Sequence, residues 1–125
     1  MVYTVALNPA LERTLCVERI QANDANRIES EERYAGGKGI DVSKVLTALG
    51  TNNRVLGLIG GFAGEELEGW LLNEVIGCNF ARISGETCTN IIVNDMSTGK
   101  QIVLSDKGPE IRTCELMQMI HKIET

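Results

Sequence analysis

The sequence predicts an α/β fold, in which helices cover a parallel β-sheet and a smaller set of half-exposed strands stands beside it. Two observations support this prediction. Short apolar runs alternate along the chain with segments whose apolar residues recur at helical spacing, and this alternation is typical of parallel sheets. Other segments mix polar and apolar residues and are better suited to a small flap with one exposed face.

The first half of the chain is predicted to form extended segments followed by a helix. Residues 2–7 are an apolar strand, residues 13–20 a half-exposed strand, and residues 26–37 a polar extended segment. From Gly39 the spacing becomes helical, and Gly50 is a natural residue to end that helix. The apolar residues of this helix are Ile40, Val42, Val45, Leu46 and Leu49.

The second half continues the alternation and adds a hairpin. Residues 54–61 form a buried strand, residues 63–77 a helix closed by its last glycine, and residues 80–84 another strand. Residues 89–104 are predicted as a hairpin, and residues 112–124 as an amphipathic helix. The apolar residues of the two helices are Leu67, Leu71, Leu72 and Val75 in the first, and Leu116, Met119, Ile120 and Ile123 in the second.

Composition limits the classes of function. A length of 125 residues fits one domain or part of a larger one, and a formal charge of −5 argues against a general nucleic-acid binder. The four cysteines form no Cys-x-x-Cys pair, and with a single histidine they predict free thiols in a reducing compartment rather than a zinc site. No secretion signal or membrane-spanning run is visible, so we expect a cytoplasmic protein without a membrane partner.

A glycine-rich turn, Gly36-Gly37-Lys38-Gly39, leads into the first predicted helix. Its spacing matches neither the P-loop nor the dinucleotide-binding fingerprint. Exposed backbone N–H groups at a helix start favour an anion, Lys38 adds a positive charge, and Asp41 can accept hydrogen bonds from ligand hydroxyls. The same residues also fit a tight turn with a solvated lysine, and the spacing does not decide between the two interpretations.

A second glycine cluster, residues 60–69, also follows a strand and begins a helix. It allows the alternative of a nicotinamide-dependent oxidoreductase, with Glu65 or Glu66 in proton transfer. Acidic residues in a first helical turn are common because they complement the helix dipole. The next predicted strand, residues 80–84, is followed by Gly85 and Glu86, which make a poor match to the acidic residue that such cofactors need.

Five stretches, taken in order, resemble the ribokinase-like PfkB carbohydrate kinases over nearly the whole chain. They are "ALNPALERT", "NRIESEERYAGGKGIDVSKVLTALG", "GLIGGFAGEELEG", "ISGETCTNIIV" and "GPE". Within that family the sequence is most similar to the hexose-phosphate kinases, namely 1-phosphofructokinase and tagatose-6-phosphate kinase.

The resemblance implies an α/β/α core with a small β-sheet lid that often forms a homodimer interface. The lid would comprise residues 10–20 and 28–35 and the hairpin 89–104. The implied reaction is ATP-dependent phosphorylation of a ketohexose phosphate, such as fructose 1-phosphate, fructose 6-phosphate or tagatose 6-phosphate, with Mg²⁺. The glycine pair would then bind the sugar phosphate rather than ATP.

Carried over residue by residue, the resemblance implies a substrate site with three departures from the family pattern. Glu12 stands where the family has a shorter carboxylate, Asp41 where it commonly has asparagine, and Cys88 where it has a phosphate-binding arginine. A neutral thiol cannot replace a bidentate guanidinium on a phosphate. The full implied set of substrate-binding residues is Glu12, Gly36, Gly37, Lys38, Asp41, Cys88 and Asn90.

The family's second signature, a G-A-G-D turn that supplies the catalytic aspartate, has no counterpart in this sequence. We therefore expect residues 1–125 to be the N-terminal substrate-binding half and lid of a kinase domain, with no catalytic residues and no strong binding of ATP or Mg²⁺. We expect this chain to be inactive alone. The alternative is a non-catalytic module from a truncated gene that binds a sugar phosphate or dimerises through its lid.

Overall fold

The core of the molecule is a three-stranded parallel sheet. The computed structural model describes residues 1–124, and its core strands are β1 (Val2–Ala6), β4 (Asn53–Ile59) and β5 (Gly77–Arg82). They lie in the order β1-β4-β5, so that β1 and β5 are the two edges. This parallel sheet confirms the predicted α/β class.

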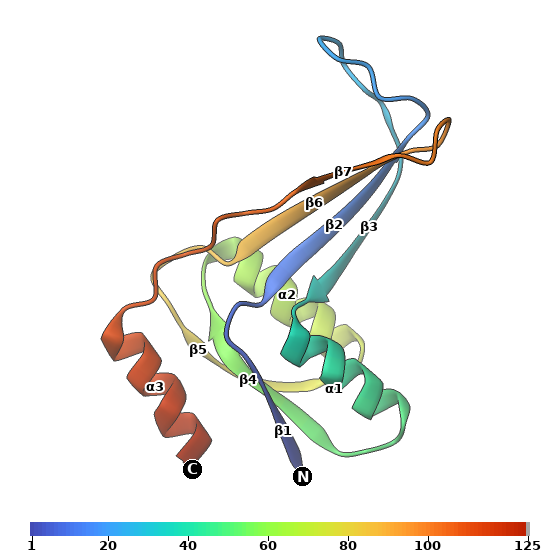
Figure 1. The fold of residues 1–125 in the computed structure, drawn as a ribbon. Helices are drawn as coiled ribbons and strands as arrows, with labels where there is room; N and C mark the ends of the chain where they lie inside the picture. Colours follow the sequence, from blue (N-terminus) through green and yellow to red (C-terminus); the bar gives the residue numbers. More distant parts are fainter. Residues whose placement is uncertain (125) are drawn as a thin grey trace.

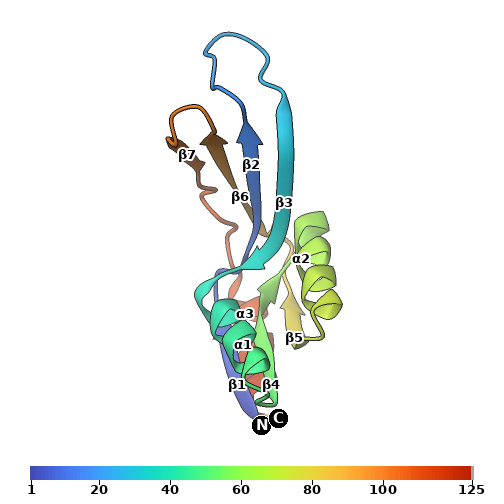
Figure 2. The same ribbon diagram turned by 90° about the vertical axis from the view of Figure 1, so that its right-hand side faces the viewer.

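Helices cover both faces of this sheet (Figures 1 and 2). On one face lie α1 (Lys38–Ala48) and α2 (Gly61–Asn73), and on the other lies α3 (Thr113–Glu124). Alternate residues of β4 divide between the faces: Ile59 packs with α1 and α2, while Leu58 packs with α3. The largest fully buried apolar side chains all belong to the first face, and they are Ile40, Val55, Ile59, Leu67 and Leu71.

A second sheet projects from the core and is called the lid sheet below (Figure 2). It consists of β2 (Ala10–Val17), β3 (Ile28–Gly36), β6 (Cys88–Asp95) and β7 (Gln101–Leu104), in the order β3-β2-β6-β7. The β2–β6 pair is parallel and the two outer pairs are antiparallel. The segments predicted for a lid thus form one sheet, apart from the core.

Helix α2 ends earlier than the sequence predicted. The expected stop was Gly77, but α2 ends at Asn73 and Gly77 is the first residue of β5. Val75 takes a positive φ of 60°, and the N–H groups of Val75 and Ile76 donate to the carbonyls of Leu72 and Leu71. This is a Schellman motif, and burial of Ile76 in the core holds a valine in the left-handed conformation. The prediction of Gly77 was wrong because tertiary packing outweighed the glycine signal.

Several of the apolar residues that recur at helical spacing in the predicted helices are exposed. Ile40 on α1 and Met119 on α3 are buried, as an amphipathic helix requires, but Val42, Val45 and Leu116 are exposed. Among residues 1–124, no helix combines the length and apolar character needed to cross a membrane.

Candidate functional site

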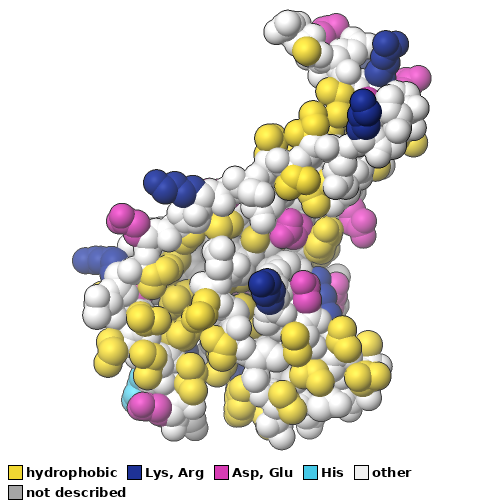
Figure 3. Space-filling view, in the orientation of Figure 1, with side chains coloured by type: hydrophobic (Ala, Val, Ile, Leu, Met, Phe, Trp, Pro, Cys, Tyr) yellow, Lys and Arg dark blue, Asp and Glu magenta, His cyan; other side chains and the backbone are white. Residues whose placement is uncertain are grey.

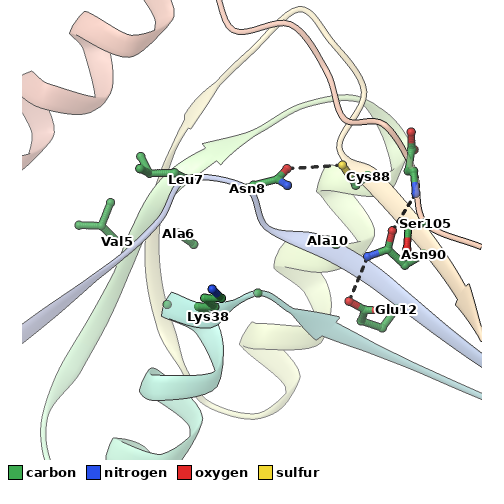
Figure 4. Close-up of a pocket in the computed structure, with 13 residues that line it drawn as sticks. Val5, Ala6, Leu7, Asn8, Ala10, Glu12, Lys38, Cys88, Asn90 and Ser105 are labelled. Carbon is green, nitrogen blue, oxygen red and sulfur yellow. Dashed lines mark hydrogen bonds between the residues drawn. The ribbon is translucent and has the colours of Figure 1, made fainter. Parts of the chain in front are cut away.

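A cavity of about 530 Å³ lies where the core meets the lid sheet. Its walls come from the end of β1 and the residues after it, the start of α1, the first residues of β2 and β6, and the segment that returns from β7 (Figure 4). The carboxyl end of a parallel strand beside a helix start is the usual place for a ligand in an α/β sheet.

The glycine turn forms one wall of the cavity. Gly37 has φ of 127° and precedes the first turn of α1, where no side chain caps the helix. Gly39 lies so close to β1 that a Cβ atom there would come within 2.5 Å of the Val5 carbonyl oxygen. Lys38 lines the cavity and is exposed. The uncapped helix start and the lysine therefore present positive charge to this end of the cavity.

Lys44 fixes the position of this helix against the lid. Its Nζ atom donates a hydrogen bond to the Ala35 carbonyl oxygen at 2.6 Å, and it lies 5.3 Å from the centre of the Tyr34 ring. Both partners belong to β3, so Lys44 ties the end of the lid strand to α1. Lys44 thus has a structural role, whereas Lys38 faces the cavity.

The opposite wall holds a chain of polar side chains. The Asn90 Nδ2 atom donates to Glu12 Oε1 at 3.3 Å, and Asn90 Oδ1 accepts the backbone N–H of Asp106 at 3.0 Å (Figure 4). Asn90 therefore links strand β2 to the segment that follows β7. Gly36 lies beneath Glu12, since a Cβ atom at Gly36 would come within 2.6 Å of Glu12 Cγ.

Cys88 lies at the back of the cavity, 2% exposed. Its thiol donates to Asn8 Oδ1 at 3.5 Å. Burial raises the pKa of the Cys88 thiol, and the nearby Asp106 carboxylate raises that pKa further. The thiol is therefore neutral at pH 7 and provides no charge, positive or negative, for a ligand.

The structure brings together most of the residues that the sequence singled out. Glu12, Gly37, Lys38, Cys88 and Asn90 all line the cavity. The other two do not belong to its lining: Gly36 is buried next to Glu12, and Asp41 is exposed on α1.

Sequence reasoning missed three polar residues of the lining, Asn8, Ser105 and Asp106. Asn8 lies within the motif "ALNPALERT", which was considered only for its carboxylate. Ser105 and Asp106 come directly after a predicted strand, but nothing local indicates that β7 leads them back to the cavity.

The residues of the second glycine cluster do not line this cavity. At the start of α2, the Ala63 N–H donates to Glu86 Oε1 at 2.9 Å, and the Gly60 N–H donates to Thr87 Oγ1 at 2.9 Å. The chain's own side chains therefore take up the N–H groups that a nucleotide phosphate would need. This geometry does not favour the dinucleotide-binding alternative.

A family model described as pfkB family carbohydrate kinase matches residues 7–113. The chain is 34% identical over 111 residues to 1-phosphofructokinase of Bacillus subtilis, which covers 89% of this chain and 36% of that protein. It is 32% identical over 123 residues to D-tagatose-1-phosphate kinase of Bacillus licheniformis, which covers 98% of this chain and 40% of that protein.

Solved structures show the same fold. A Staphylococcus aureus protein assigned as a phosphofructokinase superimposes on all of this chain with a TM-score of 0.93 and 30% identity, over 40% of its own length. Phosphofructokinase-2 of Escherichia coli, solved in complex with fructose 6-phosphate, gives a TM-score of 0.90 at 24% identity, over 41% of its length. The chain thus spans about two fifths of the length of these relatives.

Proposed function

The chain belongs to the PfkB family of carbohydrate kinases, and on that basis we propose that residues 1–125 form the substrate-binding half and lid of a ketohexose-phosphate kinase. The reaction of the complete enzyme is transfer of the terminal phosphoryl group of ATP to a sugar hydroxyl. The observation that best supports this proposal is the cavity between core and lid, whose lining combines a carboxylate and an amide with a lysine and an uncapped helix start.

Each wall has a distinct task in this proposal. Glu12 and Asn90 bind sugar hydroxyls, because a carboxylate and an amide together offer both acceptors and donors. Lys38 and the first N–H groups of α1, with Gly37 allowing close approach, bind the phosphate that the sugar already carries. Gly36 contributes from outside the lining, by leaving room for the Glu12 side chain. Asp41, in the first turn of α1 but outside the lining, completes the proposed set if the ligand extends along the helix.

Cys88 limits the strength of phosphate binding. Where the family places an arginine, this chain offers a neutral thiol, and the loss of one charge-assisted contact weakens binding by about 1.5–3 kcal/mol. Two carboxylates, Glu12 and Asp106, also line the cavity. Lys38 is the single basic side chain in this lining. We therefore expect weak binding of sugar phosphates.

ATP and Mg²⁺ belong to the proposed reaction of the complete enzyme, and we expect neither to bind strongly to this chain. Within residues 1–124, no group of three histidine, cysteine, aspartate or glutamate side chains lies close enough to hold a metal ion. We expect the chain alone to have no kinase turnover.

The lid sheet is the proposed homodimer interface. Three consecutive apolar residues of its edge strand β7 are exposed, namely Ile102, Val103 and Leu104.

The alternative function is a module without catalysis, which binds a sugar phosphate or dimerises through this sheet. It shares the same cavity and the same edge strand. A cytoplasmic location is the setting we expect for either function.

Calorimetric titration of the chain with fructose 1-phosphate, fructose 6-phosphate and tagatose 6-phosphate tests the proposal. We expect at least one sugar phosphate to bind, and Lys38→Ala to weaken that binding by about tenfold. Lys100→Ala is the matched control, because Lys100 is exposed at the hairpin turn of the lid and lies outside the cavity. If none of the three sugar phosphates bound, or if the two variants weakened binding equally, the proposal would be contradicted.

An ADP-release assay on the same samples tests the expected inactivity. Sustained ADP release by the chain alone with ATP, Mg²⁺ and a bound sugar phosphate would show that the chain contains a complete catalytic site. It would also exclude the non-catalytic alternative.

A further inference from the structure

The Asp106 carboxylate lies next to Cys88 in the cavity. Asp106 comes two residues after β7 and belongs to the cavity lining. Its Oδ2 atom accepts the backbone N–H of Thr89 at 3.3 Å, and its Oδ1 atom accepts the backbone N–H of Gly108 at 3.2 Å. One carboxylate thus takes up an N–H group of strand β6 and another of the segment that returns to the core.

The turn that carries Asp106 is fixed against the lid sheet and against Cys88. The backbone N–H of Asp106 donates to Asn90 Oδ1 at 3.0 Å. Gly108, with φ of 94°, approaches so closely that a Cβ atom there would lie 3.4 Å from the Cys88 Sγ atom. Burial, and then the negative charge of Asp106, raise the pKa of the Cys88 thiol, in agreement with this proximity. Residues 106–108 therefore wrap around the Cys88 side chain.

The charged side chains of the cavity lining come from different elements. The two negative ones are Glu12 and Asp106, and Asn90 forms a hydrogen bond with each of these residues. The positive one, Lys38, belongs to the start of α1. In the space-filling view, acidic and basic side chains both appear where the core meets the lid (Figure 3). Beside Cys88 the charge is the negative charge of Asp106.

A carboxylate in this position discriminates between ligand groups. Backbone N–H groups that converge on one point bind anions, and those of Thr89 and Gly108 already bind the Asp106 carboxylate. A phosphate group that approached them would meet this carboxylate, and like charges in a partly enclosed cavity repel each other. A sugar hydroxyl is the better neighbour, because it donates a hydrogen bond to a lone pair of the exposed carboxylate.

We propose that Asp106 is a specificity-determining residue, which lowers the affinity of the cavity for phosphorylated sugars relative to unphosphorylated ones by holding a carboxylate beside Cys88. Cys88 acts in the same direction, because its thiol provides no positive charge to neutralise that carboxylate. The substrate class that fits this end of the cavity is a ketose that turns a hydroxyl, and not a phosphate, toward Asp106.

This inference rests on the proposed function, and the following experiment separates the two. Fructose, fructose 6-phosphate and inorganic phosphate are titrated separately into the ¹⁵N-labelled chain, and amide chemical shifts give the dissociation constants. Asp106→Asn removes the charge and keeps an acceptor oxygen for the turn. We expect this variant to bind fructose 6-phosphate and inorganic phosphate about fivefold or more tightly than the wild type, and to bind fructose no more tightly.

Two further variants separate the charge of Asp106 from its place in the turn. Asp24→Asn removes the same charge from the exposed loop between β2 and β3, outside the cavity lining, so we expect all three affinities to stay as in the wild type. Asp106→Glu keeps the charge but changes the length of the side chain that bonds to Gly108. We expect its preference between fructose and fructose 6-phosphate to match that of the wild type, whereas a purely structural role predicts that Asp106→Asn and Asp106→Glu change this preference alike.

The possible outcomes distinguish the inference from the proposed function. If fructose 6-phosphate binds but Asp106→Asn leaves the preference unchanged, or if Asp24→Asn or Asp106→Glu gives the same gain, the specificity role is overturned and the proposed function stands. If Asp106→Asn tightens the binding of inorganic phosphate while no sugar phosphate binds to any variant, the specificity role stands and the proposed function is overturned. If none of the three compounds binds to any variant, both are overturned.

Discussion

The Asn90 amide of β6 donates a hydrogen bond to the Glu12 carboxylate of β2, with 3.3 Å between Nδ2 and Oε1. These residues are direct neighbours across a parallel strand pair. The same amide accepts the N–H of Asp106. One side chain thus holds a carboxylate of the lid and the segment returning to the core in fixed positions around the cavity.

Asn90→Ala removes both of these contacts. We expect the free energy of unfolding to fall by about 1 kcal/mol, and sugar-phosphate binding to weaken by about fivefold or more as Glu12 loses its orientation. Gln101→Ala is the control, since Gln101 bonds to Asn94 in the same sheet but outside the cavity. Calorimetry and chemical denaturation measure the two effects. Unchanged binding by Asn90→Ala would remove Asn90 from the site.

Cys88→Arg restores a cation at the back of the cavity. A guanidinium that contacts a phosphate contributes about 1.5–3 kcal/mol, so we expect sugar-phosphate affinity to rise by about tenfold or more. Affinity for the unphosphorylated sugar should stay the same. Cys88→Ser, which keeps a small neutral side chain, serves as the control. An equal gain for fructose and fructose 6-phosphate would show that the arginine does not meet the phosphate.

Gly39→Ala tests the close contact between α1 and β1. The added Cβ atom would meet the backbone of Val5 at 2.5 Å, so we expect overpacking to lower the free energy of unfolding by about 1–3 kcal/mol. Gly69→Ala is the matched change in α2, where the new Cβ would meet no atom within 4 Å beyond the adjacent residues and the backbone of its own helix. There we expect a gain of about 0.5–1 kcal/mol, because alanine favours a helix over glycine. Denaturation curves of both variants give the two changes in the free energy of unfolding. Similar changes in the two variants would contradict the close contact between Gly39 and the Val5 backbone.

Asp95 makes the stability of the lid depend on pH. Hydrogen bonds from the Ser97 hydroxyl and the Ile20 N–H lower the pKa of Asp95 to about 2, from an ordinary value of 3.8. Because the folded pKa is the lower one, the stabilisation is fully present above about pH 4 and is lost as the pH falls toward 2.

The Asp95→Asn variant should therefore be less stable than the wild type at pH 7, and the difference should shrink as the pH falls from 4 toward 2. Glu65→Gln, on the exposed surface of α2, should leave the pH profile unchanged. Thermal denaturation followed between pH 2 and pH 7 gives both profiles. A difference between Asp95→Asn and wild type that does not vary with pH would contradict this role of the carboxylate.

The elements of the fold could be predicted where local spacing and packing agree. The apolar alternation identified the strands of the core sheet and the three helices, and Gly50, with φ of 78° just after α1, ends the first helix as predicted. The end of α2 could not be predicted, because burial of Ile76 forces Val75 into a conformation that its own chemistry disfavours. Likewise the exposure of Val42 and Val45 depends on what α1 packs against, which its periodicity does not contain.

The sequence predicted those residues of the cavity lining that lie in recognisable motifs. Glu12, Gly37, Lys38, Cys88 and Asn90 were identified and are found together. Asp106 was not identified, since its place depends on the path of the chain after the β6–β7 hairpin. The substrate roles of all these residues remain predictions.

We propose that the sugar phosphate binds at the first glycine cluster, residues 36–39, and not at the second, residues 60–69. A titration of the ¹⁵N-labelled chain with fructose 6-phosphate, followed by amide chemical shifts, distinguishes the two clusters. We predict shifts at Gly37, Lys38, Gly39 and the Asn90 side chain, with residues 60–64 unaffected. Shifts confined to residues 60–64, or no shifts at saturating sugar phosphate, would show that the first cluster does not bind the sugar phosphate.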